Sequence, residues 1–304
     1  MMKTPESSPK SLDPRTLAKL SGLQLRARRV VEGYVAGLHR SPYHGFSIEF
    51  AEHREYTPGD DLRYLDWKVF GRTDKFYLKQ FEDETNLICY LAVDISESMS
   101  YRGPESAWSK LEYAQCLAAS LAWLVLRQQD AVGLVTLDEQ LRDRLPPSSK
   151  AAHLNPLLQI LESAKPQRKT ALGPLLKQLA PTFRKRGIVI VISDLFEDVA
   201  SLAEGLKRLR RQRHDTIVLQ VLDRAEMDFP FDRPALFKGL EGCPEIVTDP
   251  RSLRHAYLRE LDNHLRAVRR ICREAEADYR LVRTDQPLDA ALSALLSARM
   301  VKVR

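Results

Sequence analysis

The chain has 304 residues, of which 44% are hydrophobic, and its 47 basic and 41 acidic residues give a formal net charge of +6. This length and composition allow a large buried core, and the basic excess is milder than a nucleic-acid-binding protein usually carries. Four cysteines without C-x-x-C spacing are expected to be reduced and mostly buried, which argues against a cysteine-based metal site: Cys89, Cys116, Cys243 and Cys272.

The N-terminal region carries no targeting signal that we can identify. Its first 20 residues lack the apolar core of a signal peptide. The longest apolar run, residues 117–126, falls short of the roughly 18 apolar residues that span a bilayer. We therefore expect a cytoplasmic protein. Residues 1–14 carry several prolines and serines and are predicted to be disordered.

An N-terminal helix is predicted from residue 15 to about residue 38, because leucines and valines recur there with a helical period. Arg26, Arg28 and Arg29 lie beside this apolar pattern. They form either a solvated helix face or a contact for an acidic partner, and a solvated face is the commoner case.

A block rich in acids, bases and aromatic residues follows at residues 44–84, with a turn predicted at Pro58-Gly59-Asp60. In one interpretation the block is a structural flap held by arginine–carboxylate pairs. In another it forms one wall of a partner-docking surface, and a third assigns a second metal to Asp60 and Asp61. The candidate partner-binding residues are Arg54, Asp60, Asp61, Arg63, Asp66, Trp67 and Arg72.

An unbroken apolar run at residues 87–93 predicts a central parallel strand, which ends in Asp94-Ile95-Ser96-Glu97-Ser98. In open α/β sheets, ligands bind at the carboxyl ends of the strands. One carboxylate and two hydroxyls are hard oxygen ligands, suited to Mg²⁺ or a similar ion. The alternative is that the serines only cap the next helix and that Asp94 makes a turn hydrogen bond.

The remaining chain alternates helical and strand patterns, which predicts an α/β fold with a Rossmann-like, doubly wound, mostly parallel sheet. The expected helices are 106–128, 150–163, 172–183, 199–211, 252–277 and 288–300. The expected strands are 131–136, an edge strand at 140–145, 188–192, 216–222 and 278–283, with a short hairpin that includes 245–248.

A loop threonine, Thr170, and a strand-terminal aspartate, Asp194, complete a pattern with Asp94, Ser96 and Ser98. This pattern resembles the metal-ion-dependent adhesion site of von Willebrand factor A (vWA) domains. The resemblance implies that the serines bind the ion directly and that the threonine and the aspartates bind it directly or through water. The expected ion is Mg²⁺, with Mn²⁺ or Ca²⁺ as alternatives. Such an ion keeps an open position that attracts an acidic residue of a partner protein.

The block at 44–84 closely resembles the conserved block of DUF58 proteins, which join it to a vWA-like domain. With the metal-site residues, the resemblance covers roughly residues 44–195. The expected organisation is a disordered segment at 1–14, an N-terminal helix and DUF58 block at 15–84 that packs on the core, and a vWA-like domain at 85–300. Glu97 departs from the vWA pattern, in which this position is more often small.

The resemblance further implies a non-enzymatic adaptor, because DUF58 proteins are commonly encoded beside MoxR-type AAA+ ATPases and other vWA proteins. Together they are thought to act in the assembly or maturation of other proteins. The chain itself contains no Walker motif. Two alternatives stay open: a metal-dependent hydrolase or phosphatase that uses Asp94 as a nucleophile, and nucleic-acid binding through the basic run at 207–213.

Overall fold

The computed structural model describes residues 17–18, 21–38, 53–55, 77–79, 87–166, 168–233, 235–237, 239–240, 242 and 245–293. The chain divides into two units, one of Met1–Gly37 with Leu87–Arg304 and the other of Leu38–Asn86. In the second unit, strands β1 (His53–Glu55) and β2 (Tyr77–Lys79) pair antiparallel. Two parts of the predicted DUF58 block thus meet in one small sheet. The segment 1–14, predicted to be disordered, lies outside the described residues.

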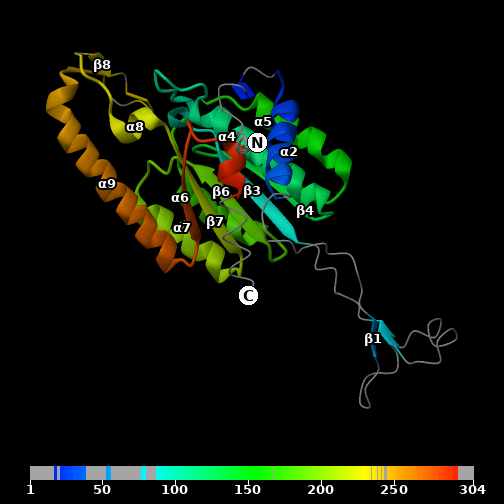
Figure 1. Cartoon of the computed structure of the whole chain (residues 1–304). Helices are drawn as coiled ribbons and strands as arrows, with labels where there is room; N and C mark the ends of the chain where they lie inside the picture. Colours follow the sequence, from blue (N-terminus) through cyan, green and yellow to red (C-terminus); the bar gives the residue numbers. More distant parts are fainter. Residues whose placement is uncertain are drawn as a thin grey trace, which may run out of the picture. The chain divides into compact units, whose positions relative to one another are not determined.

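The larger unit contains a sheet of six strands: β3 (Ile88–Asp94), β4 (Ala131–Leu137), β5 (Leu141–Ser148), β6 (Ile188–Ser193), β7 (Asp215–Leu222) and β10 (Asp278–Arg283). Their order is β10-β7-β6-β3-β4-β5 (Figure 1). All neighbours are parallel except β5, which pairs antiparallel with β4. Strands β3, β6 and β7 are almost entirely buried, as expected of strands covered on both faces. The predicted mostly parallel α/β sheet is confirmed.

Helices cover both faces of the sheet (Figure 1). Helix α4 (Lys110–Arg127) packs on one face with α5 (Leu154–Ser163) and α2 (Leu23–Leu38), and the other face carries α6 (Leu172–Leu179), α7 (Val199–Arg211) and α9 (Pro250–Glu274). A hydrophobic core lies on each face of the sheet. Alternate residues of β3 contribute to the two cores, because successive side chains of a strand point to opposite faces. Cys89, Leu91 and Val93 belong to the α4 core, and Ile88, Tyr90 and Ala92 to the α6, α7 and α9 core.

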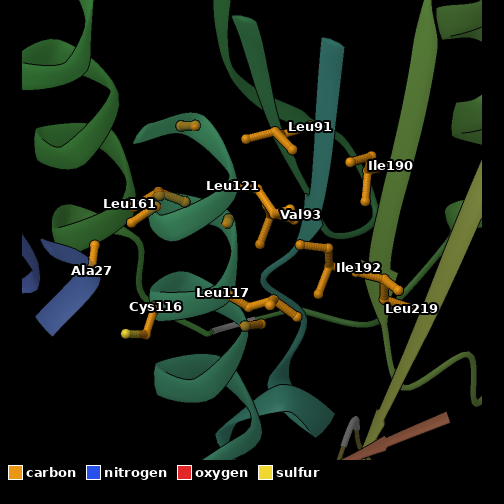
Figure 2. Close-up of a cluster of buried hydrophobic side chains, with 14 of the residues drawn as sticks. Ala27, Leu91, Val93, Cys116, Leu117, Leu121, Leu161, Ile190, Ile192 and Leu219 are labelled. Atoms are coloured by element: carbon orange, nitrogen blue, oxygen red, sulfur yellow. The ribbon is translucent and has the colours of Figure 1, made fainter. Parts of the chain in front are cut away.

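The α4 core is built in layers (Figure 2). Leu117 and Leu121 of α4 lie against the sheet side chains, including Val93, while Leu161 of α5 and Ala27 of α2 lie beyond α4 (Figure 2). All of these residues are at most 3% exposed. Two polar contacts add to this packing: the Leu23 backbone N–H donates to Glu162 Oε1 at 2.7 Å, and the Arg26 guanidinium lies 5.1 Å from the centre of the Trp108 ring.

Two helices begin later than their sequence patterns predict. Helix α2 begins at Leu23, because Gly22 adopts a left-handed φ of +83° that interrupts the helical pattern. Helix α4 begins at Lys110 and not at Ser106, because Ser109 caps it. The Ser109 hydroxyl accepts a hydrogen bond from the Glu112 backbone N–H, and the Glu112 carboxylate accepts one from the Ser109 N–H.

Helix α6 ends earlier than predicted, at Leu179, and continues as the 3₁₀ turn η4 (Ala180–Thr182), which contains Pro181. Proline lacks the N–H that a longer α-helix requires. The β8 (Ala235–Phe237) and β9 (Ile246–Thr248) strands form the expected short antiparallel pair. Residues 288–293 are helical, and the rest of the helix predicted at 288–300 lies outside the described residues. Within the described part of the chain, no helix is long and apolar enough to cross a membrane.

Helices α6 and α7 approach each other closely at two glycines. A Cβ added to Gly173 would lie 2.5 Å from the Ser201 backbone carbonyl, and one added to Gly205 would lie 2.7 Å from the Gly173 carbonyl oxygen. Neither position has room for a side chain. This contact fixes the start of α6 and, with it, the loop that carries Thr170.

Candidate metal centre

Aspartates gather at the carboxyl edge of the sheet, because the parallel strands end there together. Asp94 is the last residue of β3, and Asp138, Asp194 and Asp223 directly follow β4, β6 and β7. All four residues are buried, with exposed fractions of 0 to 2%. A buried carboxylate requires hydrogen bonds or a cation. The partners of each aspartate therefore decide what this edge can bind.

Asp94 lies at the centre of a group of hydroxyls. Its Oδ1 accepts a hydrogen bond from the Ser96 backbone N–H at 2.8 Å. Its Oδ2 accepts hydrogen bonds from Thr170 Oγ1 at 3.3 Å and from Ser193 Oγ at 2.5 Å. The hydroxyls of Ser96 and Ser98 lie 3.1 Å apart. The structure thus brings four of the five predicted metal ligands into one connected group, the Asp94 cluster of Asp94, Ser96, Ser98 and Thr170.

Two backbone hydrogen bonds hold the threonine loop against this edge. The Glu97 N–H donates to the Arg168 carbonyl at 2.7 Å, and the Ala171 N–H donates to the Asp138 carbonyl at 3.0 Å. The first bond ties the loop to the 3₁₀ helix η2 (Glu97–Ser100), which carries Ser98. The second ties the loop to the end of β4. Residues about 75 positions apart in the sequence are brought together in this way.

The fifth predicted ligand, Asp194, has a different partner. Its Oδ2 accepts a hydrogen bond from the Lys110 ammonium at 2.7 Å, and its Oδ1 accepts one from the Phe196 N–H at 3.2 Å. Lys110 also donates to Glu226 Oε1 at 2.7 Å. The Lys110 and Asp194 side chains are 1% and 0% exposed. Asp194 is therefore one member of a buried ion pair as well as a neighbour of the Asp94 cluster.

The buried carboxyl groups repel one another. Burial, together with the charge of Asp194, raises the pKa of Asp94 to about 6, although hydrogen bonds from Ser193 and Ser96 oppose the rise. Burial also raises the pKa of Glu197 to about 7, with the Asp94 charge adding to it and a hydrogen bond from the Gly173 N–H opposing it. Burial is thus the main reason that the charged forms of Asp94 and Glu197 are disfavoured, and neighbouring carboxylates add to it.

The residues of the Asp94 cluster suit a hard divalent cation. Hydroxyl and carboxylate oxygens are the ligands that Mg²⁺ and Ca²⁺ prefer. A cation at this position would favour the charged form of Asp94, whose pKa is raised by burial and by the charge of Asp194. Among the described residues, no group of three or more His, Cys, Asp or Glu side chains is placed to hold a metal. A hard site built mainly on hydroxyls is therefore the arrangement that these residues support.

Several residues of this edge have no role in the sequence prediction: Lys110, Ser193, Glu197, Asp223 and Glu226. Asp223 accepts hydrogen bonds from Ser106 Oγ at 2.5 Å and Thr284 Oγ1 at 2.8 Å. Its own N–H donates to Glu226 Oε2 at 2.7 Å, which links Asp223 to Lys110 through Glu226. Ser193 and Asp223 stand at the ends of predicted strands, and this position is the sequence signal that could have identified them as residues of the site.

The structure describes only Arg54 among the candidate partner-binding residues of the DUF58 block. Arg54 lies in β1, where its backbone pairs with Leu78 of β2. The others lie outside the described residues: Asp60, Asp61, Arg63, Asp66, Trp67 and Arg72. Their role in partner binding stays a prediction.

The basic run at 207–213 lies at the C-terminal end of α7. Two of its cations have anionic neighbours there. Arg210 donates to the Glu274 carbonyl at 3.1 Å and forms an ion pair with Glu276, and Lys207 lies 4.0 Å from the Glu274 carboxylate. Part of the charge is thus neutralised within the fold, which weakens the case for a nucleic-acid site.

The solved structures that match this chain share little sequence with it. BatB, a conserved hypothetical protein from Bacteroides thetaiotaomicron, is 22% identical, covers 71% of this chain and 99% of its own, and has a TM-score of 0.46. The VWA domain of SpRpn10 is 11% identical, covers 68% of this chain and 93% of its own, and has a TM-score of 0.39.

Relatives found by sequence have somewhat higher identity to this chain. Protein Rv1480 of Mycobacterium tuberculosis is 26% identical over 294 residues, which are 94% of this chain and 90% of the relative. YeaD of Bacillus subtilis is 27% identical over 186 residues, which are 60% of this chain and 43% of YeaD. Residues 52–267 match the family described as "Protein of unknown function DUF58". Since this match spans more than half of the chain, the protein belongs to the DUF58 family.

Proposed function

We propose that this chain is a non-enzymatic, metal-dependent module for protein interaction. In this proposal the Asp94 cluster holds a divalent cation, Mg²⁺ in the first place and Mn²⁺ or Ca²⁺ as alternatives, and the cation binds an acidic residue of a partner protein. The observation that carries the proposal is the meeting of the Ser96, Ser98 and Thr170 hydroxyls with Asp94 at the carboxyl edge of the sheet.

The ligand set favours binding of a carboxylate. Three neutral hydroxyls and one carboxylate leave half of the charge of a divalent cation uncompensated. A cation held there supplies a positive charge with an open coordination position. Thr170 and Glu97 are partly exposed while Asp94 and Ser96 are fully buried. The Thr170 side of the cluster is therefore the side from which we expect a partner to approach.

The geometry does not favour Asp94 as a catalytic nucleophile. The residue is 0% exposed, and hydrogen bonds from Ser96, Thr170 and Ser193 engage both of its carboxylate oxygens. A nucleophile must reach a substrate atom at close range. A carboxylate in these surroundings is better suited to hold a cation or to orient the hydroxyls around it.

For the partner we propose a MoxR-type AAA+ ATPase, or another vWA-domain protein that acts with one. Membership of the DUF58 family supports this choice, since such ATPases are expected to accompany members of the family. A cytoplasmic location goes with this partner and is part of the same proposal.

A capture experiment tests the proposal. The full chain is immobilised and incubated with the purified MoxR-type ATPase of the same organism, either in Mg²⁺ or in EDTA. We expect wild-type protein to retain the ATPase in Mg²⁺ and to release it in EDTA, and the Ser96→Ala/Ser98→Ala variant to retain none. Ser120→Ala is the matched control, because this buried hydroxyl lies within α4, away from the Asp94 cluster, and donates to the Cys116 carbonyl at 2.7 Å. Capture that persists in EDTA and in the double variant would contradict the proposal.

A further inference from the structure

Lys110 is a fully buried lysine with several partners. Its ammonium donates to Asp194 Oδ2 and to Glu226 Oε1, both at 2.7 Å. It also lies 5.0 Å from the centre of the Phe196 ring and 5.8 Å from that of Tyr101, within the range of cation–π attraction. Two carboxylates and two aromatic rings thus surround one cation beside the Asp94 cluster.

The position of Lys110 in its helix is unfavourable for a cation. Ser109 caps α4, so Lys110 is the first helical residue, at the end where the helix dipole repels positive charge. Lysine is also rarely buried without a paired anion. The fold accepts both costs only because Asp194 and Glu226 neutralise the ammonium. The two carboxylates that Lys110 contacts indicate that it has a role at the carboxyl edge beyond filling space.

The two carboxylates differ in what else they do. Asp194 directly follows Ser193, whose hydroxyl donates to Asp94 Oδ2 at 2.5 Å, and so lies next to the Asp94 cluster. Glu226 instead lies in the short helix α8 (Arg224–Asp228) after β7, where its Oε2 accepts a hydrogen bond from the N–H of the capping residue Asp223 at 2.7 Å. If Asp194 turned toward a cation in the Asp94 cluster, Glu226 would still neutralise Lys110. Release of Asp194 therefore leaves no unpaired buried charge.

We propose that Lys110 is a positioning residue that competes with the metal ion for Asp194. While Asp194 is paired with Lys110, the Asp94 cluster lacks its fifth ligand, and a bound ion gains that ligand only when the Lys110–Asp194 pair opens. Glu226 keeps Lys110 charged and in place in both states. This inference rests on the proposed function. It adds that Lys110 regulates the affinity of the same site for the metal ion.

Calorimetric titration of Mg²⁺ into the chelator-stripped full chain tests the inference. We compare wild type, Lys110→Met, Asp194→Asn and the double variant of both. We expect Lys110→Met to bind Mg²⁺ about tenfold more tightly than wild type. In the Asp194→Asn background, the same lysine substitution is expected to change the affinity by less than about twofold, because the contested carboxylate is gone. A lysine with a purely structural role would lower the affinity when removed.

Glu226→Gln provides a second test if Lys110→Met does not fold. It leaves Asp194 as the only carboxylate on Lys110, so we expect weaker Mg²⁺ binding than in wild type, again with no effect in the Asp194→Asn background. Lys110→Arg keeps the charge, and we expect an affinity close to that of wild type.

The outcomes separate this inference from the proposed function. If wild type binds Mg²⁺ and Lys110→Met binds it no more tightly, or if the gain persists undiminished without Asp194, the competition is refuted and the metal site stands. If Lys110→Met binds Mg²⁺ where wild type does not, the competition is supported in its strongest form. If no folded variant binds Mg²⁺, both the competition and the metal-dependent function are refuted.

Discussion

Asp94 and Asp194 are equally buried at the same edge of the sheet, yet the fold treats their charges in opposite ways. Asp94 is surrounded by hydroxyls and a backbone N–H, and its pKa rises to about 6. Asp194 has the Lys110 ammonium 2.7 Å away. Asp194 thus has a cation supplied by the protein itself, whereas Asp94 has only hydrogen-bond donors. An external cation would therefore be stabilised most at Asp94.

The largest effect is expected on the Asp194 side, from Lys110→Met in chelator. This substitution leaves Asp194 and Glu226 buried without their cation, so the free energy of unfolding should fall by about 3–5 kcal/mol. Urea unfolding followed by circular dichroism measures it. The control is Lys177→Met, which removes an exposed ion pair with Glu204 and should change little. A loss below about 1 kcal/mol for Lys110→Met would mean that the buried pair does not support the fold.

Asp94 should show the opposite behaviour, because its ionised carboxylate destabilises the folded protein. The folded protein holds a proton on Asp94 more tightly than the unfolded chain does, since the pKa is raised from 3.8 to about 6. This contribution to stability is complete below the unfolded pKa and is lost as the pH rises through 6. For a shift of this size the loss is about 3 kcal/mol.

Asp94→Asn removes this titration and tests the prediction. Between about pH 4 and pH 7.5 in chelator, the free energy of unfolding of wild type should fall by about 2.5 kcal/mol more than that of the variant. Asp198→Asn, at the exposed cap of α7, is the control and should follow wild type. Parallel pH profiles for wild type and Asp94→Asn would show that folding does not raise the pKa of the Asp94 carboxyl group.

A smaller effect on stability is expected from the contact between α6 and α7, which holds the Thr170 loop in place. Gly173→Ala would place a methyl group 2.5 Å from the Ser201 backbone carbonyl, so α6 and α7 must separate at a cost of about 1–3 kcal/mol. Thermal unfolding measures the loss. Gly133→Ala meets its nearest atom at 3.1 Å and should cost less. Equal stability of Gly173→Ala and wild type would show that this helix contact does not fix the Thr170 loop.

The framework of the sheet could be predicted because its signals are local. Continuous apolar runs predicted β3, β6 and β7, and the polar residues that end β3 and β6 located the edge where ligands bind. The helix starts were less accurate, since Gly22 and the Ser109 cap are single-residue events inside longer helical patterns. The side-chain positions of the DUF58 block stay predictions.

The charge balance of the site could not be predicted, because it depends on contacts between distant residues. Lys110 meets Asp194 and Glu226 across 84 and 116 residues of sequence. Nothing in the sequence around Lys110 distinguishes it from a solvated lysine at the start of a helix. Likewise, Ser193 precedes a predicted ligand, but only the packed sheet shows that its hydroxyl donates to Asp94.

The most direct test of the account is calorimetric titration of Mg²⁺ into chelator-stripped wild type, Ser96→Ala/Ser98→Ala and the Ser120→Ala control. The account predicts that wild type and Ser120→Ala bind one ion per chain and that the double variant binds none while keeping its cooperative unfolding. Binding stabilises a fold by about 2.7 kcal/mol at a hundredfold excess over the dissociation constant, so the unfolding midpoint should rise in the first two proteins alone. Equal Mg²⁺ binding by the double variant, or no binding by either wild type or Lys110→Met, would contradict the claim that these hydroxyls form a metal centre.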